Sequence, residues 1–314
     1  MTLMMLAVIL DLFLGDPVYR YHPVRLIGTC LSFFETQLRR RGMDGQGSGF
    51  LLFVLLTLSI LAGIEGIFWL LSQWHWLLGW GWHLYIIYSL LALKDLHVHG
   101  QRVADAAKQQ DLQQARKQAG MMVGRDSKDL DLAGCNRAAI ESISENLADG
   151  VIGPLFYLIL FGVPGMIVFK IVSTMDSMVG YRNSEYIHFG WFGARLDDWL
   201  NWIPARLTWL LISGSAFLLP AYSGMKAFHT GWSQHCLLPS PNAGWSQAAA
   251  AGALQLKLVG PIWREGKLAH EHWMGDSRDR EGANPDDIAK MSRIANLSTF
   301  LFISLILLLN LIFF

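Results

Sequence analysis

The feature that most constrains this chain is a set of long apolar runs. Phe50–Leu71 contains one charged residue, Glu65, while Trp76–Leu93 and Ala295–Phe314 contain no Asp, Glu, Lys or Arg. Each run approaches the roughly 20 residues that a helix needs to cross the hydrocarbon core of a bilayer. Because only helices or closed barrels satisfy backbone hydrogen bonds in lipid, these runs predict an all-α, polytopic membrane protein.

Three further apolar segments are less regular. Met1–Leu14 is short for a span, and Pro204–Tyr222 contains Arg206. Val151–Val172 carries Gly162-Val163-Pro164-Gly165 in its middle. Such a Gly/Pro break is typical either of a kinked span or of two half-helices that turn back, and both readings stay open.

Composition supports a membrane protein and excludes some partners. Hydrophobic residues make up 53% of the chain and charged residues 16%, against about 25% charged in soluble domains. Lys+Arg and Asp+Glu are 25 each, so no global basic field attracts nucleic acid. Cys30, Cys135 and Cys236 have neither metal-ligand spacing nor the even count of a disulfide framework.

The polar segments indicate the topology. Lys94–Gly150 has apolar residues at helical spacing and no proline. Val24–Leu38 places its apolar residues on one helical face and is followed by Arg39-Arg40-Arg41, which is typical of a helix lying in the membrane interface. The basic 15–49 and 94–150 segments are expected in the cytoplasm, and Ser72–His75, without Lys or Arg, outside.

The segment after Val151–Val172 has two possible locations. If that run spans fully, Ser173–Ile203 lies outside, whereas the chemistry discussed below favours the cytoplasmic side and therefore a re-entrant segment. We expect residues 1–314 to form a single membrane-embedded catalytic domain, with amphipathic helices beside the spans.

The first candidate site is an acidic stripe that runs into the apolar segment at Val151. Glu141, Glu145 and Asp149 follow the i, i+4, i+8 spacing of one helical face. No basic residue lies among them, so their mutual repulsion predicts a cation such as Mg²⁺ completed by phosphate oxygens. The plainer alternative is a solvated acidic face.

A second acidic group lies before the apolar segment that starts at Pro204. Asp197 and Asn201 share a helical face, with Asp198 beside them, and these oxygen-bearing residue types suit Mg²⁺. Arg206 follows and is able to clamp a phosphate. The alternative is helix capping together with an arginine that extends to the interface.

Other motifs are weaker alone. Asp176 and Tyr181 lie in the hydroxyl-rich segment Ser173–Arg182, which is able to line a polar pocket. His22, Arg25 and Arg125 lie in loops that are able to meet an anion, although a surface salt bridge explains each equally well. Asn242 begins an Ala/Gly-rich stretch that favours close helix packing.

Taken together and in order, the motifs resemble one family. The chain resembles the adenosylcobinamide-phosphate synthases of cobalamin biosynthesis from about residue 10 to about residue 300, on these motifs: GDPVYRYHPVRLIG, VGRDSKDL, ESISENLADGVIGPLF, STMDSMVGYR, ARLDDWLNWIPARL, SPNAGWSQAAAAGAL and GDSRDREGANPDDI. The chain departs from the family pattern at Ser173 and Met175, where the family has Asn and Leu, and at Arg264, where an aromatic residue is expected. These departures leave the choice of amino alcohol open.

The resemblance implies a multi-pass enzyme of the inner membrane whose active site faces the cytoplasm. It implies an ATP- and Mg²⁺-dependent ligase that joins adenosylcobyric acid to (R)-1-aminopropan-2-ol or its O-phosphate through an amide bond. Membrane lipid and other late corrinoid-assembly enzymes of the membrane are the expected partners, with no nucleic acid.

The expected roles of the site residues follow from this reading. The expected catalytic residues are Glu141, Glu145, Asp149 and Asp176. The expected cofactor- and substrate-binding residues are Arg125, Arg206, His22, Arg25, Tyr181 and Asn242. The expected metal ligands are Glu145, Asp149, Asp197, Asp198 and Asn201.

Two other functions remain open. One is a non-catalytic membrane sensor or regulator of the same fold. The other is a Mg²⁺-dependent membrane phosphoalcohol transferase, whose signature begins with Asp-Gly as at Asp149-Gly150 but continues with an Ala-Arg that this chain lacks.

Overall fold

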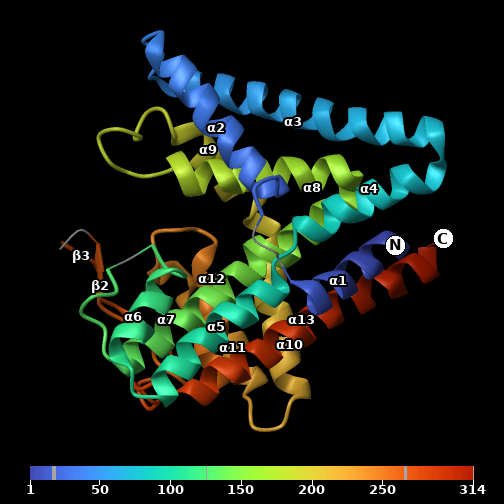
Figure 1. Cartoon of the computed structure of the whole chain (residues 1–314). Helices are drawn as coiled ribbons and strands as arrows, with labels where there is room; N and C mark the ends of the chain where they lie inside the picture. The colour runs from blue at the N-terminus through green and yellow to red at the C-terminus, as the bar shows by residue number, and fades with distance from the viewer. Residues whose placement is uncertain (16–18, 125, 265–266, 314) are drawn as a thin grey trace. The chain divides into compact units, whose positions relative to one another are not determined.

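The computed structural model describes residues 1–15, 19–124, 126–264 and 267–313 and is almost entirely helical (Figure 1). Its Cα packing separates the chain into two compact units, each assembled from two stretches of sequence. Unit 1 comprises Met1–Ala92 and Gly153–Asn201, and unit 2 comprises Leu93–Ile152 and Trp202–Phe314.

Unit 1 contains the long α3–α4 hairpin and the helices packed on it. Its helices are α1 (Thr2–Leu14), α2 (Pro23–Arg40), α3 (Gln46–Trp74), α4 (Trp76–Ser89), α8 (Gly153–Val179) and α9 (Trp191–Leu200). The hairpin turns at His75, whose Nδ1 accepts the Leu77 N–H at 3.1 Å. α2, α8 and α9 pack on α3, and α1 packs on α4.

The amphipathic pattern in the first polar segment forms α2. Pro23 occupies its first turn, where a missing N–H costs nothing, and Arg39 and Arg40 lie in its last turn, where cations favour the helix dipole. The apolar residues Ile27 and Leu31 are fully buried against the rest of unit 1. The predicted helix is confirmed, and its place at a membrane surface stays a prediction.

The Gly/Pro break predicted in Val151–Val172 is present in α8. Gly162 has φ 69° and ψ −162°, a conformation almost restricted to glycine, and Pro164 follows inside the helix. α8 therefore consists of two helical halves on either side of Gly162. Whether the two halves form a kinked span or turn back stays a prediction.

Unit 2 contains the remaining helices and short strand pairs. Its helices are α5 (Leu93–Lys108), α6 (Leu112–Gly120), α7 (Leu132–Leu147), the π-helical turn η1 (Ala148–Ile152), α10 (Trp202–Leu218), α11 (Gly224–Gln234), the 3₁₀ turn η2 (His235–Leu237), α12 (Ala243–Leu254) and α13 (Pro285–Phe313). Its strands are β1 (Leu258–Val259), β2 (Ile262–Arg264), β3 (Lys267–His270) and β4 (Trp273–Met274). β1 pairs with β4 and β2 with β3, both antiparallel, and these pairs are not among the features predicted from the sequence.

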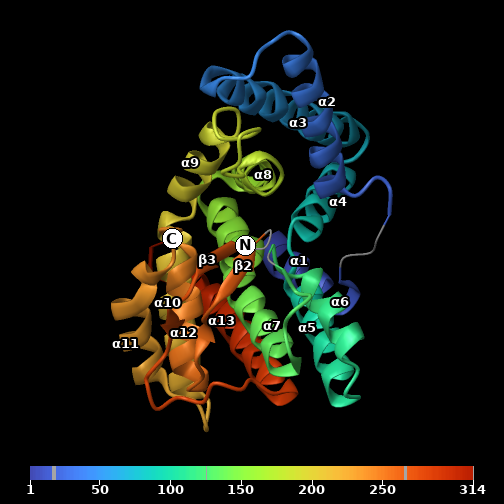
Figure 2. The same ribbon diagram turned by 90° about the vertical axis from the view of Figure 1, so that its left-hand side faces the viewer.

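Two helix groups make up the core of unit 2. α5, α7 and α13 pack on one another, and α10, α11 and α12 form the second group (Figure 2). Two helices of the 94–150 segment, α6 and α7, begin at capping aspartates: Asp111 accepts the Gln114 N–H at 2.9 Å, and Asp131 accepts the Gly134 N–H at 2.6 Å. The helical reading of this segment is confirmed.

The predicted fold class is also confirmed. By length and composition, the helical segments able to cross a membrane in the described part of the chain are Gln46–Trp74, Trp76–Lys108, Leu132–Val179 and Pro285–Ile312. α1 is apolar but shorter. α13 starts ten residues before the predicted run at Ala295, because Pro285 and a polar first turn begin the same helix.

Candidate functional site

The predicted acidic stripe begins with a carboxylate that binds other parts of unit 2. Glu141 is buried, and its Oε1 accepts the Val259 N–H at 2.7 Å. Arg137, one turn earlier on α7, lies 3.6 Å from the same oxygen and stacks on the Trp273 ring at 4.6 Å. A cation of the protein therefore lies beside the first carboxylate of the stripe, and the expectation of a Mg²⁺ ion at the stripe stays a prediction.

The other two members of the stripe have different surroundings. Glu145 accepts a hydrogen bond from Gln247 Nε2 at 2.9 Å, so it faces α12. Asp149 lies half-buried in η1, where the helix widens to π geometry. Because the 3.6-residue period does not continue through a π turn, spacing alone does not place Asp149 on the face of Glu141.

Unit 1 brings a second charged group together at the end of α8. The charge of Asp198 on α9 and that of Arg182 in the following loop both act on the Asp176 carboxylate. Arg195 Nη1 lies 3.5 Å from Asp198 Oδ2. Burial raises the pKa of the Asp198 carboxyl above its ordinary value, and Arg195 and Arg182 offset only part of this effect.

These residues adjoin a cavity of about 230 Å³. Its lining includes Tyr181, Arg182, Trp191, Arg195 and Asp198. Gly180 also lines the cavity, and a Cβ there would overlap Asp176 Oδ1, so glycine is required for this carboxylate to lie so near. The structure thus places the predicted residues Tyr181 and Asp198 in the lining of one cavity, and Asp176 close to the lining residue Gly180.

The neighbouring Asp197 faces a different environment. Asn201 Nδ2 donates to Asp197 Oδ2 at 3.1 Å, and Asn201 is 2% exposed. The Asn201 Oδ1 is buried without a hydrogen-bond partner in the described part of the chain. A carboxylate beside an unsatisfied amide oxygen fits a Mg²⁺ ion that takes its remaining ligands from water and phosphate.

The full predicted metal set does not form one cage. Glu145 and Asp149 belong to unit 2, whereas Asp197, Asp198 and Asn201 belong to unit 1. Among the described residues, no three His, Cys, Asp or Glu side chains are grouped so that they could hold a metal ion. The assignment of these five residues as metal ligands therefore stays a prediction.

Arg39, which the sequence places in the basic run after Val24–Leu38, contacts the segment that carries the cavity residue Tyr186. Arg39 on α2 pairs with Glu35 at 3.0 Å and Asp44 at 2.5 Å, and it donates to the Glu185 carbonyl at 3.2 Å. Its guanidinium also stacks on Tyr186 at 5.0 Å. The i, i+4 spacing of Glu35 and Arg39 indicates their ion pair from the sequence alone. No local pattern indicates the contact between Arg39 and the Glu185 carbonyl, 146 positions away.

His22 and Arg25 lie at the start of α2. His22 is buried at the N-cap position and packs edge-on against Tyr19 at 5.4 Å. Arg25 is exposed and lines a shallow depression of about 650 Å³ together with Arg20 and Thr29. The predicted Arg125 lies outside the described residues.

Arg206 lies among aromatic rings of unit 2. Its guanidinium stacks on Trp202 at 4.1 Å and on Trp245 at 4.9 Å, and Nη1 donates to the Trp202 carbonyl at 2.7 Å. His235 stacks on Trp245 at 3.7 Å. Asn242 is buried at the start of α12.

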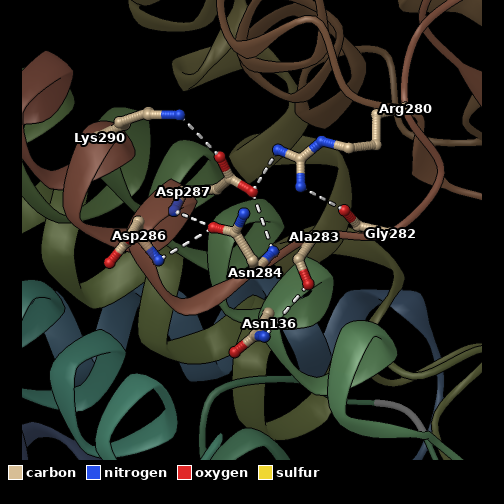
Figure 3. A network of polar contacts seen from close by, with 8 residues as sticks. All are labelled: Asn136, Arg280, Gly282, Ala283, Asn284, Asp286, Asp287 and Lys290. Atoms are coloured by element: carbon tan, nitrogen blue, oxygen red, sulfur yellow. Dashed lines mark hydrogen bonds and ion pairs between the residues drawn. The ribbon is translucent and has the colours of Figure 1, made fainter. Parts of the chain in front are cut away.

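The motif near the start of α13 forms a polar network that orders this end of the helix (Figure 3). The buried Asp287 accepts from Arg280 Nη2 at 2.6 Å, from the Asn284 N–H at 2.9 Å and from Lys290 Nζ at 3.1 Å. Asn136 on α7 donates to the Ala283 carbonyl at 3.2 Å. Asn284 Oδ1 accepts the Asp286 and Asp287 N–H groups at 3.1 Å, so the network satisfies two N–H groups in the first turn of α13 and joins this end to α7.

Known proteins resemble this chain over most of its length. A family model described as CobD/Cbib protein matches residues 4–295. The Cobalamin biosynthesis protein CobD of Photorhabdus laumondii is 40% identical over 277 residues, covering 87% of this chain and 86% of that protein. The protein of the same name from Citrobacter koseri is 37% identical over 292 residues, covering 92% and 91%.

A further relative extends the coverage. The Cobalamin biosynthesis protein CbiB of Salmonella typhimurium is 35% identical over 305 residues, covering 96% of this chain and 95% of that protein. No solved structure matches the chain. Because the family model and these relatives span nearly the whole sequence, the chain belongs to the CobD/Cbib protein family.

Proposed function

We propose that this chain acts in cobalamin biosynthesis as an ATP-dependent amide ligase. In this proposal it joins adenosylcobyric acid to (R)-1-aminopropan-2-ol or its O-phosphate and gives adenosylcobinamide or its phosphate. The observation that carries the proposal is that the chain belongs to this family, and that relatives similar to it in sequence are named cobalamin biosynthesis proteins. The charged cavity at the end of α8 supports it.

The chemistry explains why such an enzyme needs both carboxylates and cations. A carboxylate and an ammonium ion do not condense in water without activation. Phosphoryl transfer from ATP to the carboxylate forms an acyl phosphate and ADP. The deprotonated amine then attacks the acyl carbon, phosphate leaves, and one proton is released.

The chain's own residues have distinct tasks in this scheme. Asp197 and Asn201 are our candidates to hold Mg²⁺, which neutralises phosphate charge when bound. Arg206 is held rigidly by two indole rings and is suited to bind a phosphate or carboxylate. Glu145 and Asp149 remain candidate metal ligands or proton acceptors.

For Glu141 we propose a positioning role. Its carboxylate accepts the Val259 N–H and lies against Arg137, so it anchors β1 to α7. A group held in this way is a poor general base, because taking up a proton would weaken contacts that order the neighbouring segment.

The competing functions make different demands on the same residues. A sensor or regulator of this fold needs no catalytic carboxylates, whereas Glu145, Asp176 and Asp197 are all present. A phosphoalcohol transferase needs Ala-Arg after Asp149-Gly150, and here Val151-Ile152 follows. The ligase therefore accounts for more of the sequence.

The test is ligation by the purified full chain in lipid nanodiscs. With adenosylcobyric acid, MgATP and either amine, we expect adenosylcobinamide or its phosphate by mass spectrometry, together with stoichiometric ADP. The double variant Asp197→Ala/Asp198→Ala is expected to lose turnover while keeping its thermal unfolding transition. Glu271→Gln, at an exposed carboxylate of unit 2, is the matched control and should remain active.

A negative result is equally clear. Folded protein that forms no product with either amine, with and without MgATP, contradicts the ligase proposal. Full activity of the Asp197→Ala/Asp198→Ala variant would remove this pair from the catalytic machinery.

A further inference from the structure

The depression on α2 is a basic surface to which the proposed reaction assigns no task. It belongs to unit 1 and measures about 650 Å³. Its lining includes Arg20, Arg25, Thr29 and Ser32, together with Met178 of α8. Both arginines are exposed, and no carboxylate lines the described part of the depression. Its chemistry is therefore that of an anion site.

The two arginines of the depression are not neutralised within the described part of the protein. Neither Arg20 nor Arg25 forms an ion pair there, and Arg20 lies over the exposed ring of Tyr21 at 5.7 Å. Arg39, at the other end of the same helix, differs because it pairs with Glu35 at 3.0 Å. Two guanidinium groups without a counter-charge in one depression favour a ligand that carries negative charge.

The α2 helix exposes two faces of different chemistry. Arg25, Thr29 and Ser32 follow i, i+4, i+7 spacing, so they share one face. Leu26 and Phe33 lie one residue further along than Arg25 and Ser32, and therefore about 100° round the helix. Their side chains are 41% and 57% exposed. Basic and hydroxyl groups beside exposed apolar side chains are typical of a helix at the level of phospholipid head groups.

The polar face has hydrogen-bonding capacity to spare. The Ser32 hydroxyl donates to no group in the described residues, so it is free to donate to a phosphate oxygen. Thr29 Oγ1 donates to the Arg25 carbonyl at 2.8 Å. Gly28 leaves the space between Arg25 and Ser32 without a side chain, and a Cβ there would lie 3.3 Å from Met178 Sδ. The depression is thus open and lined by donors.

We propose that the depression on α2 binds the phosphodiester head group of an anionic phospholipid such as phosphatidylglycerol. Arg20 and Arg25 bind the phosphate oxygens, for which guanidinium groups have a matching bidentate geometry. Ser32 donates to the same head group, and the acyl chains lie along Leu26 and Phe33. A zwitterionic phospholipid binds less well, because its cationic group meets the same arginines.

A lipid accounts for more of this surface than a soluble anion does. A soluble phosphate ester would bind Arg20 and Arg25 but would leave Leu26 and Phe33 in water, where burial contributes about 25 cal/mol per Å² of apolar surface. α2 packs on α3 (Figure 1), and α3 is long and apolar enough to cross a membrane. A bilayer that contains α3 therefore places lipid head groups within reach of α2.

Binding is measured on the full chain in maltoside detergent by native mass spectrometry. No ATP or corrinoid is present, so the result does not depend on the proposed ligase. Equimolar phosphatidylglycerol and phosphatidylcholine with the same acyl chains compete for the protein. We expect phosphatidylglycerol to bind at least about tenfold more tightly, because only its head group carries a net negative charge. Equal affinities would overturn the inference.

Variants assign this preference to the depression. The double variant Arg20→Gln/Arg25→Gln is expected to lose at least about tenfold in affinity for phosphatidylglycerol. Ser32→Asp places a negative charge in the lining and is expected to have the same effect, whereas the uncharged Ser32→Asn should keep most of the affinity. Arg102→Gln, at an exposed position of unit 2, is the matched arginine control and should behave like wild type. Unchanged affinity in the double variant and in Ser32→Asp would refute the assignment.

A measurement on the wild-type chain keeps the test independent of how the variants fold. Phosphatidylglycerol with a photoactivatable diazirine in its head group is incorporated into nanodiscs that hold the protein. After illumination and proteolysis, we expect cross-linked peptides to include residues 19–33. Cross-links confined to other segments would contradict the site.

Soluble anions are distinguished from the lipid by competition. Glycerophosphoglycerol carries the head group without acyl chains, and we expect it to displace phosphatidylglycerol at least about tenfold less effectively than the short-chain lipid does. Equal displacement would assign the depression to a soluble phosphate ester. Displacement of the lipid by adenosylcobyric acid would assign it to the corrinoid, in line with the substrate role expected for Arg25. Either result would overturn the lipid proposal.

Discussion

At the scale of single residues, two carboxylates of the same predicted site have opposite surroundings. Glu141 is 5% exposed and accepts a backbone N–H from Val259. Asp198 lies at a cavity, with Arg195 3.5 Å away. Glu141 therefore stabilises the packing of β1 on α7. Burial of Asp198 disfavours its ionised form and raises its pKa.

We predict that Asp198→Asn does not lower stability at neutral pH. A raised pKa means that the folded state binds the proton more tightly than the unfolded chain, whose Asp has a pKa of about 3.9. The stabilisation that comes from protonating Asp198 is therefore fully present below the unfolded-state pKa. It is lost as the pH rises through the higher pKa of the folded state. The ionised group costs stability at pH 7, and the neutral amide removes this cost.

The prediction is checked by measuring the Tm of wild type and of Asp198→Asn at pH 7 and at pH 4. We expect a small rise in Tm for the variant at pH 7 that disappears at pH 4. Glu271→Gln should show no such pH-dependent difference. A lower Tm of Asp198→Asn at pH 7 would mean that the pair with Arg195 outweighs the burial.

At the scale of elements, some helices are interrupted and others are packed closely. α8 is interrupted at Gly162, and α7 passes into the π-helical η1 before α8 begins. α12 is closely packed, because Cβ atoms at Gly244 and Gly252 would overlap backbone atoms of His235 and Lys226. This agrees with the packing explanation of the Ala/Gly-rich segment.

We predict that Gly162→Ala destabilises α8 by about 1–3 kcal/mol, the cost of a side chain in this backbone region. Space is not the cause, because an added Cβ would meet only Pro164 Cδ at 3.7 Å. Gly63→Ala in α3 is the control, since nothing lies within 4 Å of its Cβ and alanine favours a helix by about 1 kcal/mol. Thermal unfolding in detergent compares the two, and equal stability of Gly162→Ala and wild type would contradict the strain.

At the scale of the whole molecule, each unit is built from two separate stretches of the chain. The segments Trp76–Lys108 and Leu132–Val179, both able to cross a membrane, each contribute residues to both units. The chain thus passes from one unit to the other within each of these two segments. Cooperative behaviour of the chain as one domain stays a prediction.

Topology is predicted from the charges of the loops. In a chain whose Cys30 and Cys236 are replaced by Ala, His75→Cys should react with a membrane-impermeant maleimide in intact cells. Lys117→Cys, in the basic 94–150 segment, should react only after permeabilisation. Tyr181→Cys should behave like Lys117→Cys, because we expect the cavity to face the cytoplasm. Labelling of Tyr181→Cys in intact cells would contradict the re-entrant form of α8.

The sequence by itself determined the membrane-capable helices and the break at Gly162. These features depend on hydrophobicity, spacing and backbone preference within a few residues, so they can be read along the chain. The motifs likewise pointed to the family before any fold was known.

Only the tertiary structure decided which of the predicted residues share a site. Glu141 meets Val259 across 118 positions of sequence, and Arg39 reaches Glu185 across 146. The cavity is lined by Asp198 together with Arg182 and Arg195, two arginines that are not among the predicted site residues. Asp176 interacts electrostatically with Asp198 and Arg182. The physical reason is that long-range pairing depends on how the helices pack, which no local pattern encodes.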